Sequence, residues 1–314
     1  VRRQRQMCIR DSHKVKSSNW NSNKSVWELE IHENNKLKYM TCNFLFLCGG
    51  YYSYTKPHMP SFKNQDKFLG QIIHPQFWNK DVDYIDKNIA VIGSGATAIT
   101  IVPAISEKSK HVTMIQRSPT YVVSGPSEDK INKFLRKFLP TKITYFLIRW
   151  KNILWQSFTF SLARKYPERT KNKILDLIKD ELGPDYDIDK HFTPSYKPWD
   201  QRICLVPDSD LFKAIGDKKA SIVTDTIDEF QSDGILLNSG EKVKADLIIT
   251  ATGIKLNALN DINVTLDGIK LDPHERLTYK GMMLSEVPNF AISFGYVNAS
   301  WTLRADLTLS LIHI

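Results

Sequence analysis

The chain has 314 residues, of which 42% are hydrophobic and 25% are charged, as in a soluble globular protein of one to three domains. Its net charge of +9 would suit nucleic acid or an anionic membrane, but no zinc-finger spacing or RNA-binding signature accompanies it, so no nucleic-acid partner is expected. No apolar run is long enough for a transmembrane helix, and no signal peptide is recognisable. The four cysteines form no C-x-x-C pair, so we expect no bound metal and a reduced, cytoplasmic location.

Two parts of the chain share one order of predicted elements: a hairpin, a short buried strand and a small-residue turn that ends in glycine. The first part runs from Val26 to Gly50 and the second from Gly234 to Gly253. In each hairpin, two extended segments enclose a turn rich in Asn, Ser or Gly, at 34–35 and at 238–240. The repeat predicts two similar domains of the dinucleotide-binding type.

Between the two repeats lies the pattern F-x-G-x-x-x-H-x-x-x-W, which is formed by Phe68, Gly70, His74 and Trp78. Four fixed positions at this spacing are specific, because the chain has only 8 His and 7 Trp. A lone histidine is more often a core or surface residue. The signal therefore comes from the pattern as a whole.

A strand and a glycine-rich turn follow this pattern. Asn88–Ile92 is a short apolar run typical of a buried strand, and the next six residues are Gly93, Ser94, Gly95, Ala96, Thr97 and Ala98. Gly93 allows a tight turn, Gly95 lets the backbone approach a pyrophosphate, and Ala98 lets the next helix pack close to the strand. G-x-G-x-x-A is weak alone, but its place after a strand predicts a dinucleotide-binding unit.

The next predicted strand, His111–Ile115, ends in Gln116, Arg117 and Ser118. In a dinucleotide-binding domain, an acidic residue near this place would bind the ribose 2′-hydroxyl of NAD, whereas Arg pairs with the 2′-phosphate of NADP. Arg117, beside Ser118, therefore favours NADPH over NADH. The alternative is that Arg117 is a solvated charge at the end of a strand.

The periodicity becomes helical between Lys130 and Leu182, where bulky apolar residues are interleaved with Lys and Arg. This predicts a helical insertion over residues 126–200 inside the second domain. A basic, aromatic helix could lie on a membrane surface as a weak peripheral contact. The alternative that we favour is a helical subdomain that covers an active-site cleft. After the insertion, Asp210–Ile215 predicts a helix and Ala220–Thr224 a buried strand.

The pattern of Phe68, Gly70, His74 and Trp78 resembles the fingerprint of type I Baeyer–Villiger flavin monooxygenases, which also lies between two dinucleotide-binding domains. Further stretches are similar to the ethionamide-activating FAD-containing monooxygenases of that family, at 93–99, 116–121, 197–207, 251–253, 279–283 and 298–301. The similarity extends roughly over residues 20–307. Two departures are Asn79, which stands where the fingerprint usually has Pro or Asp, and Gln201, which stands where many relatives carry Lys.

The resemblance implies an FAD- and NADPH-dependent monooxygenase that inserts one oxygen from O2 into ketones or oxidises sulfur compounds through a flavin peroxide. It assigns Arg202 as the catalytic residue that stabilises the charge of the peroxide, because a planar guanidinium suits an oxyanion in a desolvated site. The alternative is a structural ion pair of Arg202 with Asp200 or Asp208. Two other interpretations stay open: an N-hydroxylating or sulfide-oxidising flavin monooxygenase, and a catalytically inactive NADP-binding fragment.

The same resemblance makes His74 and Trp78 part of a hinge between domains, with no acid–base role for the histidine. Ala251, Thr252 and Gly253 follow the buried strand of the second repeat, and their small size permits close approach of the backbone to the flavin. The expected cofactor-binding residues are Gly93, Ser94, Gly95, Ala96, Thr97, Ala98, Arg117, Ser118, Gln201, Ala251, Thr252 and Gly253.

Together these inferences give an α/β protein with two Rossmann-like dinucleotide-binding domains, the first incomplete, and a helical insertion in the second. Residues 1–87 would form part of the FAD domain with the linker and fingerprint, 88–250 the NADP-binding domain, and 251–314 a return segment to the FAD domain. No G-x-G-x-x-G precedes Trp20, so we expect the chain to lack the N-terminal flavin-binding motif. The stretches 1–12 and 308–314 match no neighbouring element, and we expect both to be non-native.

Overall fold

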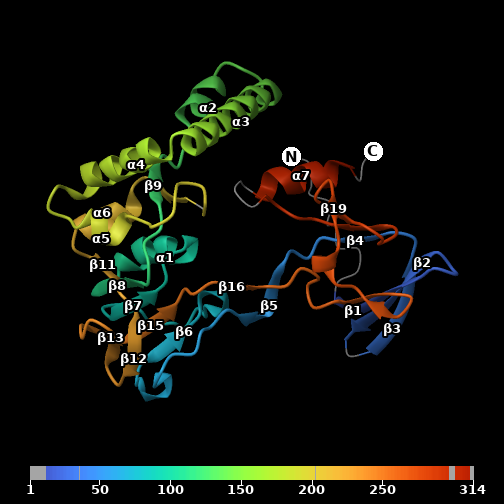
Figure 1. Ribbon diagram of the computed structural model, residues 1–314, viewed down its shortest axis with the longest axis horizontal. Coiled ribbons are helices and arrows are strands. Elements are labelled where there is room, and N and C mark those ends of the chain that lie inside the picture. Colours follow the sequence, from blue (N-terminus) through green and yellow to red (C-terminus); the bar gives the residue numbers. More distant parts are fainter. Residues whose placement is uncertain (1–11, 35, 202, 297–300, 312–314) are drawn as a thin grey trace. The chain divides into compact units, whose positions relative to one another are not determined.

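The computed structural model describes residues 12–34, 36–201, 203–296 and 301–311. It divides the chain into two compact units, of which unit 1 comprises residues 1–57 and 254–314 and unit 2 comprises residues 58–253. The chain therefore leaves unit 1 after Pro57 and returns to it after Gly253 (Figure 1). Both units contain strands and helices, and each has its own buried core, so the predicted α/β class is confirmed.

The centre of unit 2 is a parallel sheet of five strands in the order β11-β8-β7-β15-β6. These strands are β6 (Gln71–Ile73), β7 (Asn88–Ile92), β8 (His111–Gln116), β11 (Ala220–Thr224) and β15 (Leu247–Thr250). One face is covered by α1 (Ala96–Ser106) and α6 (Asp210–Gly216). The other face is covered by an antiparallel sheet of β12 (Ile227–Gln231), β13 (Gly234–Leu237) and β14 (Lys242–Lys244). The strands, the helix and the hairpin predicted for this part of the chain are confirmed.

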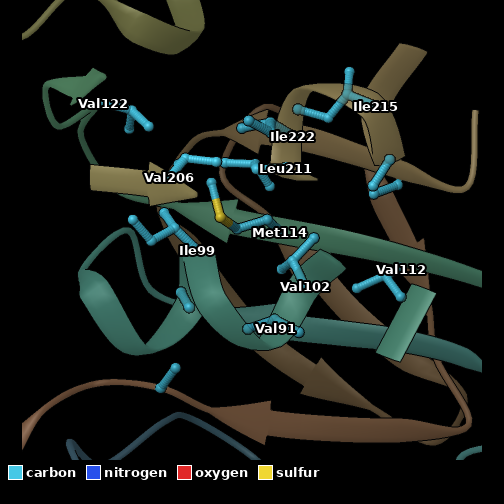
Figure 2. Close-up of a cluster of buried hydrophobic side chains, with 14 of the residues drawn as sticks. Val91, Ile99, Val102, Val112, Met114, Val122, Val206, Leu211, Ile215 and Ile222 are labelled. Atoms are coloured by element: carbon cyan, nitrogen blue, oxygen red, sulfur yellow. The ribbon is translucent and has the colours of Figure 1, made fainter. Parts of the chain in front are cut away.

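Coverage on both faces explains the unbroken apolar sequence of β7. Ile89 and Val91 belong to the core beneath α1 and α6, whereas Ala90 and Ile92 belong to a second core beneath β12, β13 and β14. A strand with no solvated face needs no polar alternation and reads as a continuous apolar run. Figure 2 shows side chains of the first core, among them Val91, Ile99, Val102, Val112, Met114, Leu211, Ile215 and Ile222.

Unit 2 also carries the helical insertion, which is confirmed. Its helices are α2 (Lys130–Leu135), α3 (Thr141–Lys165), α4 (Pro167–Leu182) and α5 (Ile188–Phe192). Two short parallel strands frame it, β9 (Val122–Gly125) and β10 (Cys204–Pro207), and they pair with each other. This pair was not predicted, because each strand has four residues and finds its partner on the far side of the insertion. Ile174 and Ile178 of α4 and Phe192 of α5 join the first core.

Unit 1 contains a sheet in the order β18-β17-β1-β2-β3, formed by β1 (His13–Asn21), β2 (Val26–Glu33), β3 (Lys36–Cys42), β17 (Asn263–Leu266) and β18 (Ile269–Lys270). Three further strand pairs are β4 (Leu45–Leu47) with β21 (Phe290–Ile292), β5 (Tyr52–Pro57) with β16 (Ile254–Leu256), and β19 (Thr278–Tyr279) with β20 (Met283–Leu284). The predicted hairpin of β2 and β3 is confirmed. Helix α7 (Trp301–Leu311) includes residues 308–311, which are part of the stretch 308–314 that we expected to be non-native.

The core of unit 1 is built around Trp27, which is fully buried. Its indole N–H donates to the backbone oxygens of Pro288 and Asn289, at 3.2 and 3.1 Å. The aromatic rings of Trp20 and Phe290 flank it at centroid distances of 5.7 and 5.6 Å. A buried tryptophan needs such an acceptor for its N–H, so the segment before β21 is fixed to the hairpin of β2 and β3.

Candidate functional site

Strand β7 ends at the glycine-rich turn, and α1 begins directly after it. Gly93 has a φ of 138°, and a Cβ there would lie 2.4 Å from the backbone oxygen of Ala251, so the position requires glycine. At Gly95, by contrast, no atom lies within 4 Å of the place of a Cβ. The turn is therefore closed on the side of β15 and open above Gly95. Ala98 is fully buried, which allows α1 to pack closely on the sheet.

Helix α1 starts without a side-chain cap: no side chain accepts a hydrogen bond from its first N–H groups. These groups have no partner within the helix, so an uncapped start favours a bound anion. Gly95, Ala96 and Thr97 are exposed here, and Ser94 is partly exposed. The backbone N–H groups of this turn can therefore reach a ligand from solvent.

The turn forms one wall of a pocket of about 680 Å³ at the carboxyl ends of the parallel strands. Its other walls are Arg117 and Ser118 after β8, Asp225 after β11, the segment 251–253 after β15, and residues 58–62. Ligands of open α/β sheets bind outside the carboxyl ends of the strands. The structure thus brings the predicted residues at the ends of β7, β8 and β15 into one pocket.

Two charged side chains of opposite sign line this pocket. Arg117 is exposed and forms no ion pair with any carboxylate that the structure describes. Asp225 accepts a hydrogen bond from the N–H of Ser239 at 3.0 Å, and hydrogen bonding from Ser239 lowers the pKa of the Asp225 carboxyl. The pocket therefore offers a free guanidinium for an anion and an ionised carboxylate for a hydrogen-bond donor. Asp225 was not predicted from the sequence, where its one signal is its place directly after a predicted strand.

The fingerprint residues surround β6, the edge strand of the sheet. Phe68 is buried in the second core of unit 2. Gly70 is required for steric reasons, because a Cβ there would lie 2.4 Å from the backbone oxygen of Asp246. Trp78 is 36% exposed, and its ring meets Tyr84 edge-on at 6.1 Å. Phe68 and Gly70 thus seat β6 against β15, while Trp78 remains at the surface.

His74 is buried at the end of β6, and both of its ring nitrogens are hydrogen-bonded. Nδ1 accepts from the N–H of Gln76 at 3.2 Å, so Nε2 carries the proton and donates to the backbone oxygen of Gly253 at 3.0 Å. Burial lowers the pKa of His74, which favours this neutral form. The N–H of His58 also donates to the Gly253 oxygen, and Thr252 Oγ1 donates to the backbone oxygen of His58 at 2.6 Å.

These bonds join the two segments through which the chain passes between the units. His58 is the first residue of unit 2 and Gly253 is the last. Beyond them, the segments continue as the antiparallel pair of β5 and β16. His58 therefore joins the outgoing segment to the returning one, and His74 ties the end of β6 to the same returning segment. The sequence indicated a hinge role, but it gave no sign that the partner of His74 lies 179 positions away.

Not every predicted cofactor-binding residue lines the pocket, since Ala96, Thr97 and Ala98 already belong to the first turn of α1. Arg202 lies outside the described residues, and Gln201 is exposed in a short bridge with Pro198 and does not line the pocket. Unit 1 shows no second glycine-rich strand–turn–helix unit in its described part. The described residues contain no group of three side chains that could hold a metal ion. Nor do they form a helix long and apolar enough to cross a membrane.

Sequence comparison supports the resemblance. The family described as flavin-binding monooxygenase-like matches residues 8–258. The FAD-containing monooxygenase EthA of Mycobacterium tuberculosis (strain ATCC 25618 / H37Rv) is 50% identical over 300 residues, which are 95% of this chain and 61% of that protein. The probable FAD-binding monooxygenase AlmA of Acinetobacter sp is 44% identical over 306 residues, which are 97% and 61% of the two proteins. The chain thus spans 61% of the length of these curated relatives.

Solved structures share the fold. The oxidised steroid monooxygenase bound to NADP matches with a TM-score of 0.74 at 18% identity, over 96% of this chain and 65% of that one. The open crystal structure of cyclohexanone monooxygenase matches with a TM-score of 0.71 at 15% identity, over 96% and 67% of the two chains. These likenesses confirm the predicted fold with dinucleotide-binding domains.

Proposed function

The chain belongs to the flavin-binding monooxygenase-like family, and from this premise we propose that the protein is a monooxygenase that uses NADPH, FAD and O2. Bound NADPH would supply a hydride, and FAD would supply the chemistry that activates O2. The observation that carries the proposal is the pocket of unit 2, where the open glycine turn, the uncapped start of α1 and the unpaired Arg117 meet.

The residues of this pocket suit NADPH. The N–H groups of Gly95, Ala96 and Thr97 would hold the pyrophosphate, because they are exposed at an uncapped helix start. Arg117 would bind the 2′-phosphate through charge-assisted hydrogen bonds, with Ser118 beside it. Asp225, ionised and at the end of the neighbouring strand, suits the amino group of the adenine ring as an acceptor.

The fingerprint histidine, His74, would couple coenzyme binding in the pocket to the segments that join the two units. Thr252 and Gly253 line the pocket. Thr252 also donates a hydrogen bond to His58, and Gly253 accepts one from His74. A coenzyme that contacts the segment 251–253 would therefore act on the same backbone that joins the units. In this proposal His74 holds backbone in place and transfers no proton.

The flavin site is proposed on sequence grounds. Residues 1–87 and 251–314 would belong to the FAD domain and 88–250 to the NADP-binding domain. The described residues of unit 1 offer no glycine-rich strand–turn–helix unit for the flavin's diphosphate, so no step is assigned to a residue there. On the same grounds, Gln201 would contact a phosphate of the nicotinamide nucleotide, and Arg202 would face the flavin.

The substrate proposed is a small ketone or a sulfur compound. Ketone oxygenation is favoured because the spacing of Phe68, Gly70, His74 and Trp78 resembles the Baeyer–Villiger fingerprint. The second candidate, sulfide or amine oxidation, shares the same coenzymes. We propose a cytoplasmic location with peripheral contact to a membrane.

Two measurements test the function. The first is titration calorimetry of this chain with NADP⁺ and NAD⁺, in which tighter binding of NADP⁺ is expected and equal binding would contradict the role of Arg117. The second uses a version extended to the length of the relatives, with bound flavin measured by its visible absorbance and product counted per NADPH consumed. Ester formed from a ketone, with or without sulfoxide formed from a thioether, supports the main proposal. Sulfoxide or hydroxylated amine with no ester supports the second candidate, and NADP⁺ binding without flavin supports a non-catalytic role.

A further inference from the structure

Helices α2 and α3 expose large apolar side chains on one surface. On α3 they form the stripe Ile143, Phe146, Leu147, Trp150, Leu154 and Phe158, each at least 43% exposed. Their spacing of three or four residues puts them along one side of the helix. Phe134 of α2 and Phe138, which follows that helix, are exposed as well, and their rings lie 5.1 Å apart. We call these eight residues the α2–α3 surface. In Figure 1, α3 reaches beyond α4 and away from the sheet of unit 2.

The same segment is strongly basic. Residues 130–165 contain nine Lys and Arg and no Asp or Glu. Three of these cations pair with acids outside the segment. Lys130, Lys137 and Lys142 form no ion pair with any residue that the structure describes. Exposed aromatic residues and unneutralised cations therefore occupy one pair of helices, and the formal charge of +9 on this segment equals the net charge of the whole chain.

We propose that the α2–α3 surface binds the headgroup region of an anionic phospholipid membrane. The apolar stripe would enter the boundary between headgroups and acyl chains, while the lysines would meet lipid phosphates and carboxylates. Helix α3 has 25 residues, so it would lie in the membrane plane over about 37 Å. The inference deepens the peripheral contact proposed above and does not depend on the oxygenation chemistry.

Other occupants suit the surface less well. A second copy of the chain would bring two basic segments together without an acid to neutralise them. A polynucleotide would neutralise the lysines but would leave the apolar stripe in water. A lid over the coenzyme pocket would hide the stripe in unit 2, whereas Trp150 is 49% and Leu154 is 63% exposed. An anionic bilayer offers both negative charge and an apolar layer.

Vesicle flotation tests the proposal with the whole 314-residue chain. The chain is expected to float with vesicles of mixed phosphatidylcholine and phosphatidylserine, and not with phosphatidylcholine alone. Lipids brominated near the headgroup should quench tryptophan fluorescence, and Trp150→Phe should reduce the quenching. Equal partition into both kinds of vesicle, or no partition into either, would overturn the proposal.

Variants separate the two parts of the surface. Lys137→Glu with Lys142→Glu should weaken partition at least tenfold, because each cation near an anionic surface contributes a factor of about five. The matched control, Lys108→Glu with Lys110→Glu, changes two exposed lysines in the turn between α1 and β8 and should have little effect. Phe146→Ser with Leu154→Ser should also weaken partition, with helix content checked by circular dichroism.

Three results count against a lipid partner. If light scattering shows a dimer, and this dimer is lost in the variant Phe146→Ser with Leu154→Ser, the surface binds a second copy of the chain. Weaker NADP⁺ binding in either α2–α3 variant would assign it to the coenzyme site. If a version extended to the length of the relatives binds no anionic vesicles, the surface is covered by the rest of the protein.

Discussion

Replacing His74 with alanine removes two hydrogen bonds at the end of β6, one to the N–H of Gln76 and one to Gly253 in the segment that returns to unit 1. The ring is 6% exposed, so water has little access to the groups that lose their partner. The N–H of Gln76 loses its acceptor, whereas the oxygen of Gly253 keeps the N–H of His58. Each hydrogen bond contributes a net of about 1 kcal/mol, so the loss of both should let this region open more easily by about 2 kcal/mol.

Hydrogen exchange followed by mass spectrometry measures this change directly. A loss of about 2 kcal/mol should speed the exchange of the amides of His58 and Gln76 roughly thirtyfold. Peptides from α1 serve as the internal control, because no hydrogen bond of His74 reaches that helix. His74→Gln keeps an amide donor for the Gly253 oxygen, so its effect should be about half as large in free energy.

Two outcomes would refute this reasoning. Unchanged exchange at His58 and Gln76 in a folded His74→Ala protein would mean that the ring does not hold the end of β6 to the returning segment. An equal acceleration in α1 would mean that the whole of unit 2 is destabilised, and His74 would then be a packing residue of the core.

Three further predictions concern the pocket and its pH dependence. Arg117→Ala should weaken NADP⁺ binding about tenfold to a hundredfold in calorimetry and leave NAD⁺ nearly unchanged, because a charge-assisted hydrogen bond contributes about 1.5–3 kcal/mol; an equal loss for both coenzymes would contradict the phosphate role. Gly95→Ala should keep the Tm, since its Cβ enters open space, and should weaken binding of both coenzymes, since that space is where the pyrophosphate would approach the backbone. Gly93→Ala should lower the Tm by several degrees, since its Cβ meets the Ala251 oxygen. A larger loss of Tm in Gly95→Ala than in Gly93→Ala would refute the steric argument. Burial lowers the pKa values of His74 and His191, so the unfolded chain binds more protons than the folded chain in mildly acidic solution. Stability should therefore be highest above about pH 6.5 and fall as the pH drops from there through the folded pKa values, and urea midpoints that rise in acid would contradict this.

The sequence by itself determined the local units and the family. Three local elements were predicted correctly, because each depends on neighbouring residues. They are the apolar strand before Gly93, the helices between Lys130 and Leu182, and the hairpin before Gly253. The need for glycine at position 93 was also predicted correctly, because the local turn requires a positive φ there. The fingerprint indicated the family through spacing alone.

The tertiary structure decided what those residues touch. Gly70 is needed because β6 approaches the backbone of Asp246, and His74 is bonded because β15 returns Gly253 beside it. Neither contact leaves a local pattern, since the partners are far apart in the chain and meet only when the parallel sheet forms. The same holds for Asp225, which reaches the pocket because β11 lies beside β8, and for the α2–α3 surface, whose exposure depends on what the rest of unit 2 covers. Periodicity reports which residues share a face, but only packing decides whether that face is buried.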